Sequence, residues 1–363
     1  MYFPSVSDID FDRLKVISPD SSICQFLIFI GEKSADEMPY LLSRLEEKSI
    51  KCLGGIFPNL ILDTETTDSG ILICEIPPVI SRFQLTMEDL EHWNQPISLE
   101  GVGSAILLSD GTIGETNAFL KGVHSLLGSK IPLVGGGAGR IDLSTHPCLF
   151  TEEGSFHSGG LLALLPNPAK VAVRHGWTKF DGPFLATKVD KNIIHEINWR
   201  PALDVYKEVV EKDSGKMITS ENFLDVAKSY PFGLFKEGTE YVIRDPFAIS
   251  DNQSIVCITE IPENSVFYIM QGNPESLLQA AAEVGKSIRT LDDSVINSLI
   301  LFTCISRILY LGDRFQEELA AFKQDHPTKI RGVATLGEIA CTGTGFVEFY
   351  NKTIVSCHFL PVE

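Results

Sequence analysis

Polar side chains and a glycine run follow one another in the first half of the chain, in an order that could bind a small ligand. A short apolar run suited to a buried strand ends in Ser109 and Asp110. The later glycine run begins with Gly135, Gly136 and Gly137, whose backbone amides could cradle a carboxylate because no side chain is in the way. We predict that these five residues contact a ligand. Two alternatives stay open: Asp110 caps its own turn, and the glycines only allow close packing.

A second group of candidates lies near the end of the sequence. Arg307 could hold a carboxylate with its two-pronged donor face, or it could pair with Glu338 for structural reasons. Glu338 could receive an ammonium group or make a structural hydrogen bond, and Cys304 stands where a nucleophile could stand. Together with Asp110, these residues would suit a zwitterion such as an amino acid better than a pure anion, because the acidic chain disfavours a bare anion.

Three stretches of the sequence repeat one order of elements: strand, polar loop, helix, strand and glycine turn. They occupy residues 26–55, 104–139 and 299–338, with polar loops at 31–33, 109–111 and 303–307. The order indicates internal duplication, although the same order of elements is common in α/β proteins in general. Loops at the C-terminal ends of strands bind ligands in such folds, so the candidate residues are expected at those ends.

The remaining segments complete the predicted fold. Residues 1–22 show little periodicity and contain two prolines, which predicts a loosely docked leader. Runs at 159–165, 170–177 and 184–189 indicate an antiparallel sheet, and runs at 345–350 and 353–359 indicate a closing hairpin. We predict an α/β fold of repeated β-loop-α-β units with additional antiparallel strands. Its two domains would be 23–200 and 201–363.

Composition and charge narrow the class of protein. A chain of 363 residues with 44% hydrophobic and 21% charged residues is typical of a soluble globular protein with a substantial core. No apolar run reaches the ~18 residues that a membrane span needs, and the N-terminus lacks the basic region of a signal peptide. The net charge of -18 repels phosphate backbones. We therefore expect neither a nucleic-acid partner nor a membrane.

The eight cysteines are scattered, and no Cys-x-x-Cys occurs. Several lie in apolar runs, as buried reduced cysteines do in cytoplasmic proteins, so we expect a cytoplasmic location. The spacing argues against a structural zinc site and against c-type haem. No metal and no cofactor are expected from these residues.

Several short motifs stand in an order that resembles the FIST family, with the match running from about residue 24 to the end. The motifs are Ser109-Asp110-Gly111, Gly135 to Gly139, His157-Ser158-Gly159-Gly160, His175-Gly176-Trp177, Pro201-Ala202-Leu203, Tyr230-Pro231-Phe232-Gly233-Leu234, Tyr241-Val242-Ile243-Arg244, Cys304 with Arg307, Gly337-Glu338-Ile339 and Tyr350-Asn351-Lys352-Thr353. The resemblance implies paired FIST N and FIST C domains. It also implies an intracellular sensory module that binds an amino acid or similar metabolite and signals to a partner protein.

The resemblance has departures and rivals. The first glycine turn, beginning at Gly54, lacks the Gly-Cys pair usual in the family, and no output segment follows, which suggests a stand-alone member. A rival hypothesis is a hydrolase or lyase with Ser109 or Cys304 as nucleophile, which would need a histidine or lysine within hydrogen-bond reach. Another is a haem-based nitric oxide sensor, for which His157 and His175 would be the ligands.

Overall fold

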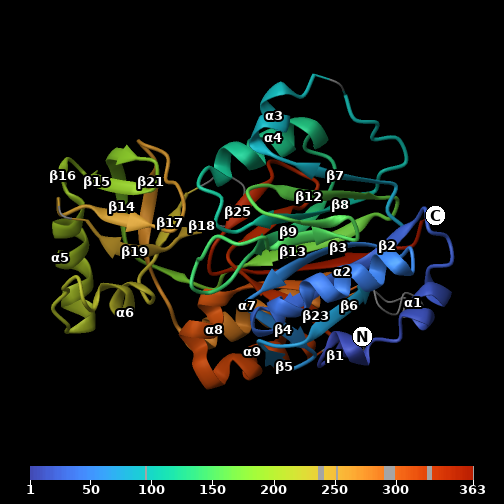
Figure 1. The fold of residues 1–363 in the computed structure, drawn as a ribbon. Helices are drawn as coiled ribbons and strands as arrows, with labels where there is room; N and C mark the ends of the chain where they lie inside the picture. Colours follow the sequence, from blue (N-terminus) through green and yellow to red (C-terminus); the bar gives the residue numbers. More distant parts are fainter. Residues whose placement is uncertain (95, 236–240, 251, 290–298, 325–328, 363) are drawn as a thin grey trace.

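The computed structural model describes residues 1–94, 96–235, 241–250, 252–289, 299–324 and 329–362. Within these residues, three six-stranded sheets form a core, and an eight-stranded sheet forms a smaller body at its side (Figure 1). The predicted α/β class, with repeated units and additional antiparallel strands, is confirmed.

The three core sheets share one strand pattern. The first contains, in spatial order, β1 (Tyr2–Phe3), β6 (Ile71–Glu75), β2 (Cys24–Gly31), β3 (Lys51–Phe57), β10 (Leu149–Thr151) and β11 (Gly154–Phe156). The second contains β25 (Glu348–Tyr350), β24 (Glu338–Cys341), β9 (Leu133–Ala138), β8 (Ser104–Asp110), β12 (Gly160–Leu165) and β7 (Ser81–Leu85). The third contains β13 (Ala169–Arg174), β26 (Ile354–Phe359), β22 (Leu299–Cys304), β23 (Arg331–Thr335), β4 (Asn59–Leu62) and β5 (Glu65–Thr67).

Each sheet is built around one parallel pair, namely β2 with β3, β8 with β9, and β22 with β23. An antiparallel strand, β6, β12 or β26, flanks the first member of each pair. A glycine lies at the same register point of each second strand: Gly54, Gly135 and Gly332. An added Cβ there would collide with the carbonyl oxygen of the neighbouring strand in each case. The three units therefore share one architecture, as the duplication hypothesis predicts.

A hairpin follows each parallel pair along the chain but joins the sheet of another unit. The hairpin β4–β5 follows β3 and pairs with β23, β10–β11 follows β9 and pairs with β3, and β24–β25 follows β23 and pairs with β9. This exchange is cyclic, so every sheet is completed by a hairpin from a different unit. The backbone hydrogen bonds of these exchanged hairpins consequently hold the three units together.

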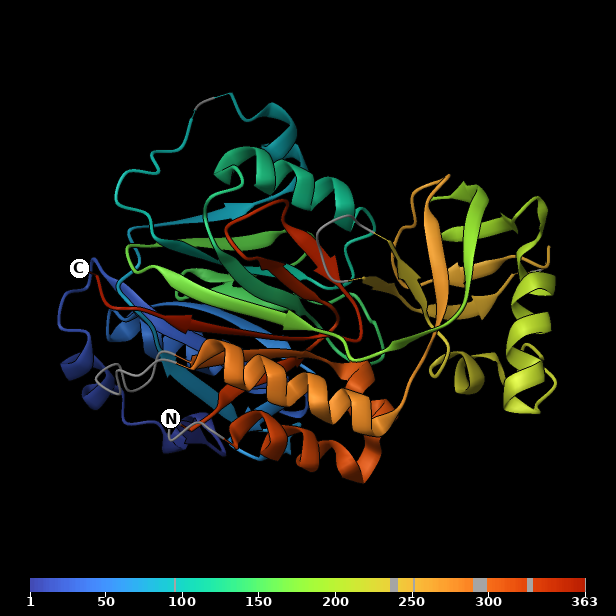
Figure 2. The same cartoon turned by 180° about the vertical axis from the view of Figure 1, so that it is seen from behind.

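Helices cover the outer faces of the three sheets, as both views show (Figures 1 and 2). These helices are α2 (Met38–Glu47) on the first sheet, α3 (Met87–His92) and α4 (Thr116–Leu127) on the second, and α7 (Pro274–Ile288), α8 (Ile305–Leu311) and α9 (Phe315–Lys323) on the third. The inner faces meet in an apolar core, where the ring of Phe29 lies 5.2 Å from Phe57 and 6.1 Å from Phe302. None of the described helices has the length and apolar character needed to cross a bilayer.

Three expectations about local segments are wrong. The leader is not loosely docked, because β1 pairs with β6 and α1 (Phe11–Ile17) packs Leu14 into the core. The strands β12, β13 and β14 (Thr178–Asp190) do not form one sheet but belong to three. The closing hairpin does not form, since β25 pairs with β24 and β26 pairs with β22, so Asn351 and Lys352 carry the chain between two sheets.

Residues 178–271 form the smaller body, which we call the inserted unit. It contains β14 (Thr178–Asp190), β15 (Ile193–Ile197), β16 (Arg200–Pro201), α5 (Ala202–Ser214), α6 (Phe223–Ala227), β17 (Phe232–Leu234), β18 (Val242–Arg244), β19 (Pro246–Ile249), β20 (Ile255–Cys257) and β21 (Val266–Gln271). The chain enters it directly after β13, which runs parallel to β22 because both are antiparallel to β26. The inserted unit therefore lies at the C-terminal end of β22.

Candidate functional site

Asp110 is buried at the end of β8, and the loops around it satisfy its carboxylate. One oxygen accepts hydrogen bonds from Thr112 N at 2.8 Å and Thr112 Oγ1 at 2.7 Å, and the other accepts from Ser158 N at 2.8 Å. These contacts agree with the second interpretation of Asp110, in which its side chain caps the turn that follows β8. Asp110 thereby joins the loop after β8 to the loop before β12.

Ser109 points away from Asp110. Along β8, Ile106 and Leu108 belong to the central core, whereas Ala105 and Leu107 pack under α4. Side chains alternate between the two faces of a strand, so Ser109 lies on the α4 side and Asp110 on the core side. The Ser109 hydroxyl has no hydrogen-bond partner in the described part of the chain. The predicted pair of ligand contacts is thus divided between two faces of the sheet.

Gly135, Gly136 and Gly137 lie inside strand β9, not in a turn. The strand pairs with β8 on one side and with β24 on the other, and Gly137 N donates to Gly337 O at 2.8 Å. A Cβ added at Gly136 would meet Thr335, and one added at Gly137 would meet Gly111. Close packing of neighbouring strands, the second interpretation given above, therefore accounts for these glycines. Because they lie within hydrogen-bonded strands, they do not form a loop whose backbone amides are free to bind a ligand.

Cys304 and Glu338 do come together, on the inner side of the core. Their side chains are hydrogen-bonded, Thr335 Oγ1 donates to Glu338 at 2.6 Å, and Thr353 N donates to it at 3.2 Å. Burial raises the pKa of Glu338 to about 8 and the pKa of the Cys304 thiol to about 12. Burial of both groups therefore favours their protonated, uncharged forms.

The nucleophile hypothesis gains no support from this geometry. Cys304 Sγ accepts a hydrogen bond from Ser306 Oγ at 3.0 Å, and its raised pKa keeps it a thiol. Among the described residues, no histidine or lysine side chain is hydrogen-bonded to Cys304 or to Ser109. The activating base that such chemistry requires is not in place.

Arg307 is completely buried and forms an ion pair, but with Glu318 and not with Glu338. Its Nε lies 3.0 Å from one carboxylate oxygen and its Nη2 lies 2.9 Å from the other, in bidentate geometry. The remaining donors reach the carbonyl oxygens of His175, Lys352 and Leu277. All five N–H donors of Arg307 are therefore used within the protein, and none is left for a ligand. Arg307 has a structural role, as the second interpretation proposed, although its partner is Glu318.

The two histidines considered for haem differ in their surroundings. His175 is buried, and its Nδ1 accepts a hydrogen bond from Trp177 N at 2.9 Å. Burial and the nearby Arg307 lower the pKa of His175 to about 3, so the imidazole is neutral. His157 is exposed in the loop before β12. Among the described residues, no group of three or more His, Cys, Asp or Glu could hold a metal ion.

A charged cluster joins the core to the inserted unit. Lys352, from the crossover between β25 and β26, reaches across the boundary to Asp245 Oδ2 at 3.0 Å and to the carbonyl oxygen of Lys228 at 3.0 Å. The Lys352 ammonium also lies 5.2 Å from the ring of Trp177, and a second cation, the Arg307 guanidinium, lies 5.6 Å from the same ring. We call Trp177, Asp245, Arg307, Glu318 and Lys352 the junction cluster.

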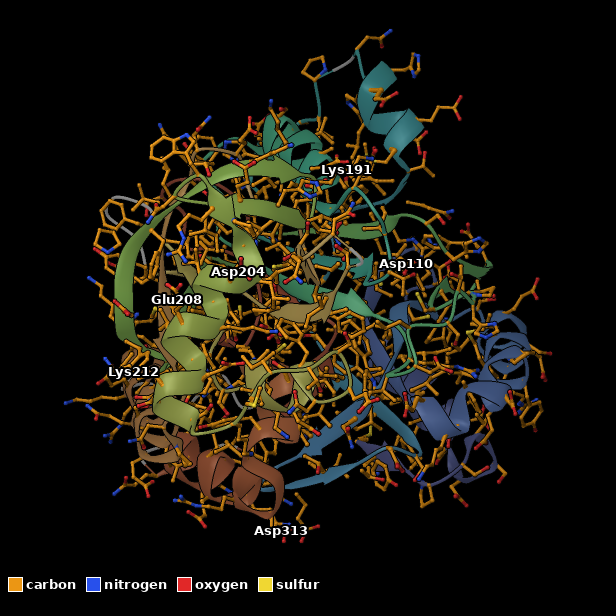
Figure 3. All side chains as sticks on the ribbon, turned by 90° about the vertical axis from the view of Figure 1, so that its left-hand side faces the viewer. Asp110, Lys191, Asp204, Glu208, Lys212 and Asp313 are labelled. Carbon is orange, nitrogen blue, oxygen red and sulfur yellow. The ribbon has the colours of Figure 1, made fainter. Side chains whose placement is uncertain are left out.

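Further contacts cross the same boundary. Arg244 Nη1 donates to Phe349 O at 3.1 Å, and Thr259 Oγ1 donates to Asn351 Oδ1 at 2.9 Å. On the other side, Lys191 reaches Glu115 at 3.4 Å. Figure 3 looks onto the inserted unit, with Asp204, Glu208 and Lys212 along α5, with Lys191 above and to the right of that helix, and with Asp110 to its right. The inserted unit is therefore anchored by polar contacts at several points.

Two buried polar atoms of the junction cluster have no hydrogen-bond partner among the described residues. They are Asp245 Oδ1 and Trp177 Nε1, which belong to the two side chains that flank the Lys352 ammonium. Arg244, also buried, has no carboxylate within ion-pair distance in the described chain, and its Nη2 makes none of its hydrogen bonds. Buried polar groups are nearly always paired, so Asp245 Oδ1 and Trp177 Nε1 are the atoms of this cluster whose chemistry suits contact with a small polar molecule.

Sequence reasoning missed most of this cluster. Asp245, Glu318 and Lys352 were not among the candidates, although Lys352 stands in a quoted motif. Lys352 is fully buried and has a positive φ of 55°. A lysine in the left-handed region at a crossover is unusual, but the sequence alone does not show that backbone conformation.

Comparison with family models covers most of the chain. The FIST N domain model matches residues 25–200, and the FIST C domain model matches residues 202–341. A search of the curated proteins finds no match. The inserted unit contains the boundary between the two matched regions, and strands from both regions share the second and third sheets.

Proposed function

The chain belongs to the FIST family, whose domains are sensory domains of signal transduction, and from that premise we propose that it senses a small ligand at the junction cluster. The observation that carries this proposal is the pair of unpartnered buried atoms, Asp245 Oδ1 and Trp177 Nε1, on either side of Lys352. A bound molecule that satisfies both atoms would remove an energetic cost that the unliganded protein bears.

The two atoms define complementary ligand chemistry. Asp245 Oδ1 needs a donor, such as an ammonium or hydroxyl group, and Trp177 Nε1 needs an acceptor, such as a carbonyl or carboxylate oxygen. A free amino acid or a similar small metabolite combines these groups. We therefore propose that class of ligand.

The crossover segment 351–353 supplies a physical link from this site to the rest of the molecule. Lys352 pairs with the inserted unit through its side chain, and its carbonyl oxygen accepts a hydrogen bond from Arg307 at 2.8 Å. The next residue, Thr353, donates its N–H to Glu338 in the core. A ligand that shifts Lys352 would thus alter contacts in both the inserted unit and the core.

We propose that the signal passes to a separate partner protein in the cytoplasm. All eight cysteines are free and buried, which fits a reducing compartment. The inserted unit projects from the core and is held by polar contacts, so its position could change when the junction is occupied (Figure 1).

A thermal-shift screen of amino acids and small carboxylates tests the proposal. Trp177→Phe removes the Nε1 donor and keeps an aromatic ring between the two cations. A ligand at about 100 times its Kd stabilises the wild type by roughly 2.7 kcal/mol. We expect the Trp177→Phe variant to bind it about ten-fold more weakly, because one hydrogen bond is lost. Arg307→Ala and Asp110→Ala are unsuitable, since both remove structural contacts.

Trp93→Phe is the matched control, because Trp93 packs edge-on against Phe83 beside the second sheet and is not part of the junction cluster. It should keep the full ligand response. A ligand that stabilises Trp177→Phe as strongly as the wild type would refute the junction as the site. If no compound in the screen stabilises the wild type, the proposed ligand class is wrong.

A further inference from the structure

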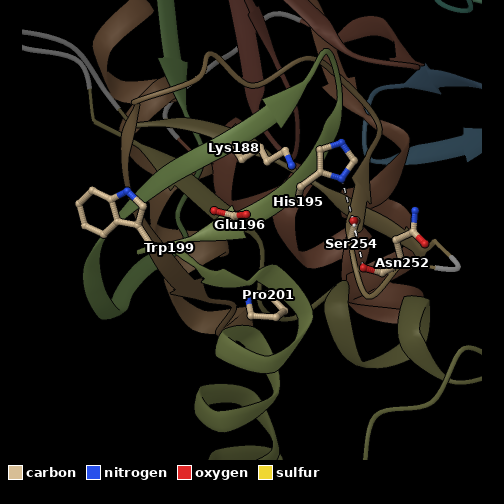
Figure 4. Close-up of a pocket in the computed structure, with 7 residues that line it drawn as sticks. All are labelled: Lys188, His195, Glu196, Trp199, Pro201, Asn252 and Ser254. Carbon is tan, nitrogen blue, oxygen red and sulfur yellow. Dashed lines mark hydrogen bonds between the residues drawn. The ribbon is translucent and has the colours of Figure 1, made fainter.

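The inserted unit carries a cavity of about 380 Å³ that no residue of the junction cluster lines (Figure 4). Residues of β14, β15, β16 and the segment before β20 line it: Lys188, His195, Glu196, Trp199, Pro201, Asn252 and Ser254. Its volume lies within the range of small-molecule sites. The ligand site proposed at the junction cluster does not include this cavity, so the two sites are independent of each other.

Two opposite charges face the cavity without neutralising each other. Lys188 and Glu196 are directly opposite on β14 and β15, next to a β-bulge. Opposite charges at such positions usually interact. Here, neither side chain makes an ion pair or hydrogen bond within the described chain, so an ammonium group and a carboxylate are both left available. Figure 4 shows the Glu196 carboxylate between the Trp199 ring and the Lys188 side chain in that view.

Trp199 is held in an exposed and unfavourable position. It forms a two-residue turn with Asn198 between the paired residues Ile197 and Arg200, and both turn residues have positive φ, 50° and 59°. Such turns favour glycine at the second position, because a side chain there is strained. The indole is nevertheless 76% exposed and stacks on no other ring or cation in the described chain. Strained, exposed residues of this kind cluster at ligand sites.

The opposite wall of the cavity is fixed. His195 Nδ1 and Ser254 Oγ are hydrogen-bonded at 2.9 Å, and Ser254 is buried. This bond orients the imidazole so that only its Nε2 remains for other contacts. Lys188 lies on this side of the cavity in Figure 4, and Trp199 lies on the other. The cavity therefore has a cationic side and an aromatic, acidic side.

We propose that this cavity binds a betaine-type zwitterion, a small molecule with a quaternary ammonium group and a carboxylate. The quaternary ammonium lies against the Trp199 ring and is balanced by the Glu196 carboxylate. The carboxylate of the ligand pairs with Lys188. The chain's net charge of -18 favours the approach of a cationic group.

A quaternary group fits the cavity better than a primary ammonium. A primary ammonium carries three N–H donors and requires about three acceptors. Beside the Trp199 ring the cavity offers one free carboxylate, Glu196, because the other possible acceptors, Asn252 and His195 Nε2, lie on the opposite side in Figure 4. The aromatic face attracts a cation without accepting a set of hydrogen bonds. A methylated ammonium has no N–H to satisfy, so the aromatic face and one carboxylate suffice.

Calorimetric titration of the full chain with four probes tests this site: glycine betaine, choline, glycine and acetate. We expect glycine betaine to bind most tightly, choline to bind more weakly because it lacks the carboxylate, and glycine and acetate to bind at least ten-fold more weakly than betaine. Trp199→Ala and Glu196→Gln should each weaken betaine binding by at least ten-fold. Lys188→Met should make the affinities for betaine and choline similar.

Trp93→Phe is the control variant and should bind betaine as the wild type does. Glycine binding as tightly as betaine would overturn the quaternary preference. Betaine binding that survives both Trp199→Ala and Glu196→Gln would overturn the site, and so would the absence of betaine binding. Because the junction variant Trp177→Phe should leave this titration unchanged, failure here is distinguishable from failure of the proposed sensor site.

Discussion

A lysine, a carboxylate and a tryptophan occur together twice in this protein, with opposite surroundings. The two trios are Lys352, Asp245 and Trp177 at the junction, and Lys188, Glu196 and Trp199 at the cavity of the inserted unit. At the junction the charges are 3.0 Å apart and only 1% and 6% exposed. At the cavity the charges lie opposite each other on neighbouring strands and do not pair.

The difference shows that partners and burial decide what such residues do. A buried ion pair is costly to break, because the remaining charge has no solvent, so the junction trio contributes to the cohesion of core and inserted unit. Exposed charges cost little to leave apart, so the cavity trio can be kept open for a ligand. Residue type alone does not distinguish the two cases.

The largest expected effect comes from breaking the junction pair. Lys352→Met leaves Asp245 buried without a cation and should lower the free energy of unfolding by about 3–5 kcal/mol. The matched change Lys188→Met removes an unpaired, exposed charge and should change it by no more than about 0.5 kcal/mol. Urea unfolding of both variants measures the contrast.

A double variant sharpens this test. Lys352→Met combined with Asp245→Leu leaves no unpaired charge, so it should recover part of the lost stability. Equal losses from Lys352→Met and Lys188→Met would show that burial does not separate the two trios.

A smaller effect concerns Glu338, a buried carboxyl group that is hydrogen-bonded but has no ion-pair partner among the described residues. Burial raises the pKa of Glu338 from an ordinary 4.5 to about 8, so between these values the folded state holds a proton that the unfolded state releases. Its contribution to stability is therefore fully present below about pH 4.5 and is lost as the pH rises towards 8.

The variant Glu338→Gln cannot release this proton. Across that pH window we expect the wild type to lose stability relative to the variant by about 1.4 kcal/mol per pH unit. Urea unfolding at several pH values measures the two slopes. Parallel slopes would mean that Glu338 is already ionised in the folded protein.

The smallest expected effect is a gain in stability. Trp199→Gly replaces a side chain at a φ of 59° with the residue that such turns prefer, and should raise the free energy of unfolding by up to about 1 kcal/mol. The same variant should lose betaine binding. Thermal unfolding and the calorimetric titration together test whether Trp199 is retained at the expense of stability. A destabilised variant would show that the indole packs usefully.

The repeated units could be predicted because each is a local pattern. Strand, polar loop, helix and strand follow one another within a short stretch, and the apolar spacing on each element records which side is buried. Gly54 and Gly135 could likewise be recognised as places of close approach, though not as residues inside a ladder. The hairpin exchange could not be predicted, since β4, β10 and β24 pair with strands that are distant in the sequence or belong to another unit.

The candidate site shows the same division. The sequence placed Asp110 at the end of a strand, because the polar residue ends an apolar run. Cys304, predicted in the loop that follows its strand, is instead the last residue of β22. It did not show that Ser109 and Asp110 face opposite ways relative to the core, which depends on which side of β8 is covered by α4. It also named Glu338 as the possible partner of Arg307, whereas packing of α8 against α9 brings Glu318 there.

The sequence by itself determined the α/β class, the three units, the family and the residue types available for binding. Only the tertiary structure decided which of those residues are already satisfied by the protein. Hydrophobic spacing and turn-forming residues act over a few neighbouring residues, so they can be recognised in the sequence. The partner of a buried charge, in contrast, comes from whichever distant segment packs against it. Lys352 and Asp245, far apart in the chain and 3.0 Å apart in space, form an ion pair only because the crossover between two sheets packs against the inserted unit.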